Sequence, residues 1–428
     1  MNTDAEQLRL QGNGEKRAEW REHWKSVAAA SIGVATGFSM LQYSASVFIE
    51  PWQEAFGWSR GEIALAHNGM ILAALLSPFG GALIDRFGVR KFLLIAMTLT
   101  GICYIAMSKL AGSLPQFYMT YLCLQLVGIF TTGLAFTRVV ASRFFHARGL
   151  ALACTRIGIS LLGFILIPSL YALITTHGWQ AGFYLLSAIV LIIGLPVSYF
   201  GIRDLPEKTR PDPNDHGHRS FLSLLMADRR VLLLCVAAGL GYAPLSALLS
   251  QFQPLLTGKG IEPQTAAMLT GILAASVLIG TIISGFLVDR IWAPLVACLF
   301  GLGPLLGCLL LYTSEPSLMV AAFAAVLIGM AQGAEIDIVA YLSARYFGMR
   351  HYSTIYGSTI MATALTAVGA QVGIGLLYDA FGDYQYALIS AMVLLGGSMV
   401  AYLALGPYRD GERRSPDVIN KGILDASS

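Results

Sequence analysis

Four charged side chains lie inside long apolar runs of this sequence, where an isolated charge is costly. Two are the cations Arg138 and Arg156, and two are the acids Glu335 and Asp337, which share one run. A guanidinium is permanently charged and offers a planar fork to a carboxylate, and a carboxyl group in a poorly solvated cavity can hold a proton. These residue types therefore indicate binding of an organic anion together with handling of a proton.

The two arginines differ in depth. Arg156 lies about seven residues into its run, roughly 10 Å deep at 1.5 Å per residue. Arg138 stands near the end of its run, where its head group reaches the surface more easily. We predict both as substrate ligands, with Arg156 the stronger candidate. The alternatives for either are an ion pair with an internal carboxylate or extension of the side chain to the membrane surface.

The two acids stand two residues apart, which separates them by about 200° around a helix. They cannot both face one point, so we expect one to face a cavity and the other a neighbouring helix or the cytoplasmic gate. We predict that Glu335 or Asp337 couples a proton to transport. The alternative is a structural pair with an arginine such as Arg138, Arg143 or Arg345.

Uncharged polar side chains in other apolar runs are candidates for binding the polar groups of a substrate. His67 can titrate near physiological pH, and Asn68 follows it, although a wet vestibule explains this pair equally well. The two tyrosines of the set can also stack on an aromatic substrate, and helix packing is the alternative for every member. The other candidates are Gln42, Tyr43, Tyr242, Gln251 and Gln371.

The elements that must position these residues are membrane-spanning helices. Of 428 residues, 56% are hydrophobic and 12% are charged, about half the charged share of a soluble domain. Unbroken runs of about 20 residues indicate helices rather than barrel strands and exclude a soluble enzyme, a disordered protein and a nucleic-acid-binding protein. We expect an all-α membrane protein with spans at 26–49, 60–83, 92–111, 116–140, 149–174, 180–202, 230–255, 264–288, 293–313, 317–342, 353–377 and 384–406.

No nucleotide-binding loop, nucleophile elbow or zinc-peptidase motif occurs in the sequence. The six cysteines lie in apolar runs, without the spacing of a metal site. We therefore expect no enzyme activity, no metal and no cofactor.

The positive charges predict the topology. Lys and Arg concentrate in the even-numbered loops and the two tails, with only Arg60, Lys109 and Lys259 in the odd-numbered loops. By the positive-inside rule both termini are cytoplasmic. The stretch 203–229 is rich in Pro, Asp and Arg, as a linker is. We expect a tail at 1–25, a six-helix bundle at 26–202, the linker, a second bundle at 230–406 and a tail at 407–428.

The two halves repeat each other. The segment from Gly81 to Arg86 recurs at 285–290, and that from Ser142 to Phe145 recurs at 344–347. The segment 185–188 recurs at 388–391, so all three pairs lie about 203 residues apart. The repeat predicts two pseudo-symmetric bundles with a binding site between them near the bilayer midplane.

The loop after the second span carries a specific pattern, Gly-x-x-x-Asp-Arg-x-Gly-x-Arg-Lys. With its weaker second copy after the eighth span, the twelve spans and the central linker, it resembles the signature loop of the major facilitator superfamily. The resemblance covers essentially the whole chain and implies the major facilitator fold. The residues of the pattern and its copy are Gly81, Asp85, Arg86, Gly88, Arg90, Lys91, Asp289 and Arg290.

The pattern also predicts a conformational latch. Asp85 ends a helix at its partly negative C-terminus, where a carboxylate is unfavourable, so it needs a partner such as Arg86, Arg90 or the next bundle. A contact that is made in one conformation and broken in the other would act as a latch. The alternative is a simple turn, with Gly88 at positive φ and the basic residues keeping the loop in the cytoplasm.

Five further segments resemble the monocarboxylate- and oxalate-type branch of the superfamily in its bacterial form. That resemblance implies import of organic acid anions, usually with protons. An antiporter-type Gly-Pro signature is absent from the fifth span, and Leu124 replaces an arginine expected early in the fourth. The segments lie at 56–60, 148–151, 178–183, 346–350 and 356–357.

We therefore expect a secondary active transporter of a bacterial inner membrane that takes up a small or aromatic organic carboxylate with a proton by alternating access. We expect a monomer surrounded by lipid, with no nucleic-acid partner. The alternatives are an exporter of drugs or metabolites by proton antiport, a membrane-embedded enzyme, and a sensor with a transporter-derived body.

Overall fold

The computed structural model describes residues 2–202, 228–312 and 316–408, and the regular secondary structure of this part of the chain is helical, without a strand. Twelve of its helical segments are long and apolar enough to cross a membrane. Large apolar side chains also cover the outside of the helices, and Phe164 and Met319 are among the most exposed. Helices that are hydrophobic all round belong in lipid, so the surface agrees with the predicted membrane protein.

The first six spans are built from ten α-helices and three short irregular turns. Three of the spans are interrupted by a 3₁₀ or π-helical turn, and the first is interrupted by residues 36–38. The elements are α1 (Asn2–Ala35), α2 (Ser39–Phe56), α3 (Arg60–Leu65), η1 (Ala66–Asn68), α4 (Gly69–Phe87), α5 (Val89–Ser108), α6 (Leu114–Gly128), η2 (Ile129–Thr131), α7 (Gly133–Ala141), α8 (Arg148–His177), α9 (Trp179–Ala188), η3 (Ile189–Gly194) and α10 (Leu195–Gly201).

The last six spans are unbroken helices. They are α12 (Arg229–Gly258), α13 (Pro263–Val288), α14 (Ala293–Leu311), α15 (Leu318–Phe347), α16 (Tyr352–Phe381) and α17 (Gln385–Leu403).

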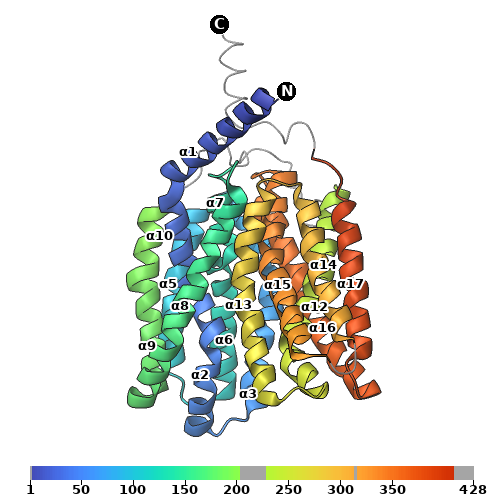
Figure 1. Ribbon diagram of the computed structural model, residues 1–428. Helices are drawn as coiled ribbons and strands as arrows, with labels where there is room; N and C mark the ends of the chain where they lie inside the picture. Colours follow the sequence, from blue (N-terminus) through green and yellow to red (C-terminus); the bar gives the residue numbers. More distant parts are fainter. Residues whose placement is uncertain (1, 203–227, 313–315, 409–428) are drawn as a thin grey trace.

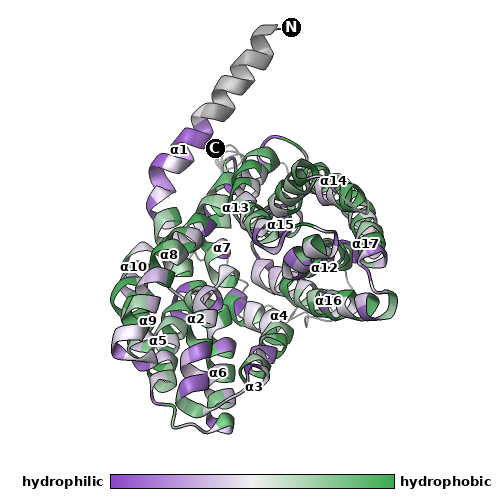
Figure 2. Cartoon of the chain, turned by 60° about the horizontal axis from the view of Figure 1, so that its bottom comes forward, coloured by the Kyte–Doolittle hydropathy of each residue, from purple (hydrophilic) through white to green (hydrophobic). Residues whose placement is uncertain are grey.

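The helices form two groups that meet along two lines of contact. Figure 2 shows α1 to α10 on one side and α12 to α17 on the other, with α4 beside α16 and α8 beside α13. We call the end of the molecule where α4 and α13 finish and α8 and α16 begin the latch end; it lies at the top of Figure 1. The arrangement confirms the predicted pair of six-helix bundles.

Two of the four interruptions in the first six spans lie in contact, although the sequence predicts continuous helices at both places. The first span breaks at residues 36–38 and the fourth at 129–132, and the two breaks touch. The backbone N–H of Phe38 donates to Thr131 Oγ1 at 2.9 Å, and the Thr131 hydroxyl donates to the Gly128 carbonyl. Threonine hydroxyls compete for backbone groups in this way, and hydropathy does not register the competition.

The predicted segment boundaries fall partly outside the described residues. The linker at 203–229 and the tail at 407–428 lie almost wholly there. At the N-terminus, α1 continues through the predicted boundary at residue 26 as one helix.

Candidate functional site

A cavity of about 640 Å³ lies between the two groups of helices. Its walls come from α2, α4, α7 and α8 on one side and from α12, α13, α15 and α16 on the other. The lining includes residues at or beside the two interruptions of the first and fourth spans, namely Ser39, Thr132 and Gly133. Interrupted helices at the interface of two repeats are a recurring way to expose backbone groups to a transported substrate.

Arg156 is the cation of this cavity among the described lining residues. Its Nη1 lies 3.6 Å from Asp337 Oδ1, and the side chains of Arg156 and Asp337 are 23% and 4% exposed. Arg156 belongs to α8 and Asp337 to α15, so the ion pair joins the two halves. The separation exceeds hydrogen-bonding distance, and Nη1 and both Asp337 oxygens lack a hydrogen-bond partner among the described residues. The guanidinium therefore retains capacity for another anion.

Three tyrosines surround the same cavity as Arg156. Tyr43 comes from α2, Tyr242 from α12 and Tyr356 from α16, and Tyr43 is 56% exposed. Phenol groups offer both an apolar ring and a hydroxyl. The site thus combines one cation with flat apolar surfaces, which suits a carboxylate that carries an apolar or aromatic body.

The two acids of α15 point to different neighbours, as their spacing predicts. Glu335 accepts a hydrogen bond of 2.6 Å from Tyr402 Oη on α17, whereas Asp337 faces Arg156 on α8. Both are buried. The arginine that pairs with an acid here is Arg156 rather than Arg138, Arg143 or Arg345.

The other predicted ligands divide into two sets. Gln42, Tyr43 and Tyr242 line the cavity. The remaining four are absent from its described lining: Gln251 accepts from Tyr384 Oη, Gln371 donates to Ser246 Oγ, His67 Nε2 lies 3.1 Å from Tyr121 Oη, and Asn68 is exposed.

Several lining residues escape prediction from the sequence. Gln332 and Tyr356 line the cavity, and the Gln332 Oε1 atom is buried without a hydrogen-bond partner among the described residues. Gln332 stands three residues before Glu335, about one helical turn away. This spacing could have identified Gln332 as a candidate lining residue. Thr155 and Ser160, which stand near Arg156 in the sequence of α8, also line the cavity and carry no such signal.

The structure places Arg138 in the latch rather than in the cavity. Arg138 is 1% exposed, forms an ion pair with Asp85 and donates to Ser353 Oγ at 2.9 Å. A buried guanidinium with these partners is unavailable to a substrate in the cavity. We therefore leave Arg138 out of the proposed ligand set.

Asp85 joins the two halves at the latch end. Its Oδ1 accepts from the backbone N–H of Ser353 at 3.1 Å, and its Oδ2 accepts from the N–H and hydroxyl of Thr354 at 2.9 and 2.8 Å. These groups belong to the first turn of α16, where the helix dipole favours a carboxylate. Of the partners that the sequence offers, Asp85 contacts the opposite bundle, and Arg138 of its own bundle is a further partner. Gly81 permits the approach, since a Cβ there would lie 2.0 Å from the Ser353 carbonyl oxygen.

Asp289 makes the corresponding contact in the second half. Its Oδ1 and Oδ2 accept from the backbone N–H groups of Gly149 and Leu150 at 2.7 and 3.1 Å, in the first turn of α8. Burial raises the pKa of Asp289 to about 6, against the opposing effect of these two hydrogen bonds.

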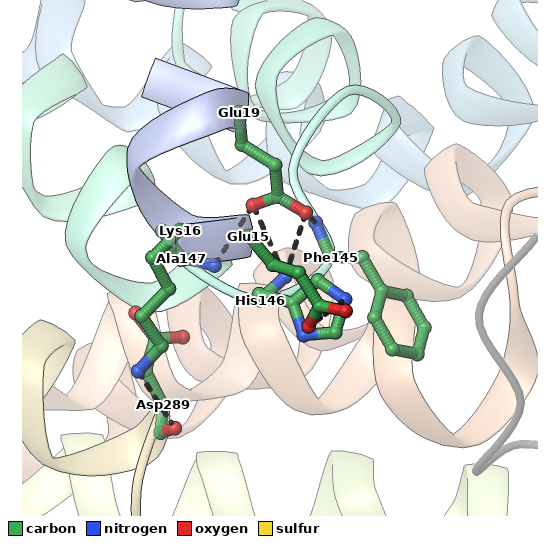
Figure 3. A network of polar contacts seen from close by, with 7 residues as sticks. All are labelled: Glu15, Lys16, Glu19, Phe145, His146, Ala147 and Asp289. Atoms are coloured by element: carbon green, nitrogen blue, oxygen red, sulfur yellow. Dashed lines mark hydrogen bonds and ion pairs between the residues drawn. The ribbon is translucent and has the colours of Figure 1, made fainter. Parts of the chain in front are cut away.

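Figure 3 shows what surrounds this second contact. Glu19 of α1 accepts hydrogen bonds of 2.9 to 3.1 Å from the residues that directly precede α8. Lys16 donates to the Asp289 carbonyl oxygen at 3.4 Å. The donors to Glu19 are the backbone N–H groups of Phe145, His146 and Ala147.

The remaining residues of the signature pattern have other surroundings in the part of the chain that the structure describes. Arg86 and Lys91 are exposed, Arg90 donates to the Tyr199 carbonyl oxygen, and Arg290 donates to that of Phe286. Gly88 has a φ of 91°, as the turn requires.

A family model described as Major Facilitator Superfamily matches residues 32–370. The chain therefore belongs to this superfamily, and its predicted fold class is confirmed. It is a multi-pass membrane transporter of small organic substrates and not an enzyme.

Individual relatives sharpen this assignment. Monocarboxylate transporter 13 of Bos taurus is 27% identical over 392 residues, which is 88% of each chain. Monocarboxylate transporter 11 of Homo sapiens is 26% identical over 415 residues, covering 89% of this chain and 83% of its own. The predicted resemblance to the monocarboxylate-type branch is confirmed.

Solved structures share the fold at low identity. The E. coli fucose:proton symporter FucP matches with a TM-score of 0.74 and 14% identity, over 89% of this chain and 98% of its own. The human organic anion transporter MFSD10 matches with a TM-score of 0.67 and 16% identity, over 90% and 99%.

Proposed function

We propose that this chain imports a small or aromatic organic carboxylate together with a proton, by alternating access across a bacterial inner membrane. The observation that carries the proposal is the ion pair of Arg156 with Asp337, which joins the two halves at the wall of the central cavity. Similarity to monocarboxylate transporters supports the same substrate class.

The distribution of charge supports an orientation of the chain in the membrane that is compatible with import. The positive-inside rule places the latch end in the cytoplasm, and the Asp85 and Asp289 contacts close that end. In this interpretation the cavity faces outward and receives the anion from outside. Arg156 then binds the substrate carboxylate, which weakens its ion pair with Asp337, and an acid of α15 takes up the proton.

Return to the cytoplasmic side requires the two latch contacts to break. The substrate and the proton can favour that change only through different affinities for the two states. An anion that draws Arg156 away from Asp337 weakens a contact between the halves, so its binding provides such a difference.

Proteoliposomes with an imposed proton gradient test the function. We expect gradient-driven uptake of at least one acid from a panel of lactate, pyruvate, benzoate and oxalate, with loss of that uptake in Arg156→Ala. The matched control is Arg60→Ala, because Arg60 is exposed, donates to Gln53 and is absent from the described lining of the cavity. Undiminished uptake in Arg156→Ala would remove this residue from the site, and loading only by antiport would make the chain an exporter.

A further inference from the structure

We infer that Glu335 carries the coupled proton, reached from the central cavity through a side chamber, and that Asp337 is the fixed counter-ion of Arg156. The inference rests on the proposed function and divides its two acids into separate roles.

The side chamber provides the route to Glu335. It has a volume of about 210 Å³ and lies among α12, α15 and α16. Three residues line both this chamber and the central cavity: Tyr242, Ile336 and Tyr356. Glu335 lines the chamber but not the central cavity. Water that enters the cavity therefore reaches the Glu335 carboxylate by passing the two tyrosines.

In the described part of the chain, the immediate surroundings of Glu335 contain titratable groups but no cation. Tyr402 on α17 donates to Oε1, and no Lys, Arg or His nitrogen lies within 4.0 Å of the carboxylate in the part of the chain that the structure describes. The titratable groups that face it are Tyr242 on α12, Cys298 on α14, Tyr356 on α16 and Tyr402 on α17. All four are uncharged near neutral pH at their ordinary pKa values.

An isolated buried carboxylate is costly to keep charged, and a bound proton removes that cost. The step is balanced: a hydronium ion in the chamber gives one proton to a carboxylate oxygen of Glu335, forming an O–H bond and leaving water. The Tyr402 hydroxyl holds the other oxygen before and after the step.

Asp337 lies in a different electrostatic setting. Its carboxylate is buried, is absent from the described lining of both cavities and has Arg156 3.6 Å away. The guanidinium compensates the charge of Asp337, and protonation would leave Arg156 without its counter-ion. The two acids therefore stand on one helix, with one beside the anion site and the other beside the chamber.

Infrared difference spectroscopy of the purified, substrate-free protein tests this division. At about pH 6, where exposed carboxyl groups are ionised, we expect the C=O stretching band of a protonated buried carboxyl group. The band should be lost in Glu335→Gln, shifted in Tyr402→Phe and retained in Asp337→Asn. Loss in Asp337→Asn with retention in Glu335→Gln would overturn the inference, as would absence of the band from the parent. Tyr402→Phe keeps the test valid if Glu335→Gln does not fold.

Transport of labelled benzoate then separates the two proposals. In proteoliposomes, Glu335→Gln should lose accumulation driven by the proton gradient while retaining benzoate exchange across the membrane. Equal loss of accumulation and exchange would contradict a role in proton coupling. A parent protein that shows the infrared band but moves no carboxylate would overturn the proposed function and leave the protonation of Glu335 established.

Discussion

Asp85 and Asp289 occupy equivalent positions in the two repeats, and each caps the first turn of a helix in the opposite half. Asp85 is 3% exposed and is paired with the buried Arg138. Asp289 is half-buried, and no cationic side chain lies within 4.0 Å of its carboxylate among the described residues. Arg143 of the first half corresponds to Arg345 of the second. By the same offset, Arg138 corresponds to Ala340, so the second half lacks this arginine.

The difference shows how one sequence motif can produce two kinds of contact. The α4–α16 contact contains a buried ion pair, and removing one partner of such a pair leaves an uncompensated charge. The α13–α8 contact depends on a carboxylate that is desolvated and, among the described residues, accepts hydrogen bonds from backbone groups only. We therefore expect the first contact to be the stronger, and the second to respond to pH.

The largest effect is expected from Asp85→Asn. The variant leaves Arg138 buried without its counter-ion, which costs about 3–5 kcal/mol and should open the latch end. Electron-spin distance measurements between labels at the exposed positions Lys91 and Ile291, one in each half, report the opening. Asp289→Asn is the matched comparison and should change these distances little at neutral pH. Equal opening in both variants would mean that Arg138 does not distinguish the contacts.

A second change should reverse part of the first. Replacing a buried ion pair by apolar residues of similar volume is often close to neutral, so adding Arg138→Met to Asp85→Asn should restore much of the closed population. The double-mutant cycle should give a coupling free energy of about 1–3 kcal/mol, measured with the same spin labels. Simple additivity of the two changes would contradict a direct energetic link between Asp85 and Arg138.

The pH response should distinguish Asp289. Its pKa is raised to about 6 by burial, so the closed contact favours the protonated acid. Protonated Asp289 stabilises the closed state fully at a pH below its ordinary pKa of 3.8, and this stabilisation is lost as the pH rises through about 6. Lowering the pH from about 7 to about 5 should increase the closed population by at most about tenfold. Asp289→Asn should remove this part of the response, and an identical response in the variant would refute the assignment.

The smallest effects are expected around the N-terminal helix. The Lys16 contact with the Asp289 carbonyl is long at 3.4 Å, so Lys16→Ala should lower the free energy of unfolding by about 0.5 kcal/mol or less. Glu19 accepts from three backbone N–H groups, and Glu19→Gln should lower the free energy of unfolding by about 1 kcal/mol. Thermal unfolding in detergent provides the measurement. A larger loss from Lys16→Ala than from Glu19→Gln would show that the contact with the second half matters more than the cap.

The sequence predicts the parts of this molecule that follow from periodicity and charge. Long apolar runs place the spans, the repeat gives two bundles, and the two-residue spacing of Glu335 and Asp337 separates their directions. The unfavourable position of Asp85 at the end of its helix predicts that this carboxylate needs a partner, with the next bundle as one of several candidates. These properties depend on residues close together in the sequence or on its repeat, so they can be predicted without knowing which helices pack together.

Other features depend on which helices become neighbours. Arg138 and Asp85 lie far apart in the sequence, and nothing local indicates that their helices pack together or that Arg138 faces the latch. The breaks at 36–38 and 129–132 are also invisible to hydropathy, because Gly and Thr are tolerated within membrane helices. His67 and Gln371 have the right residue types for a site, but their bonds to Tyr121 and Ser246 occupy them elsewhere.

The most direct test of the account is whether the site recognises a carboxylate through Arg156. Calorimetric titration of the purified protein with matched acid and amide pairs, such as benzoate with benzamide and lactate with lactamide, isolates the charge from the rest of the ligand. The account predicts that at least one acid binds, that its amide does not, and that Arg156→Ala loses the difference while Arg60→Ala keeps it. Equal binding of acid and amide, or unchanged discrimination in Arg156→Ala, would contradict it.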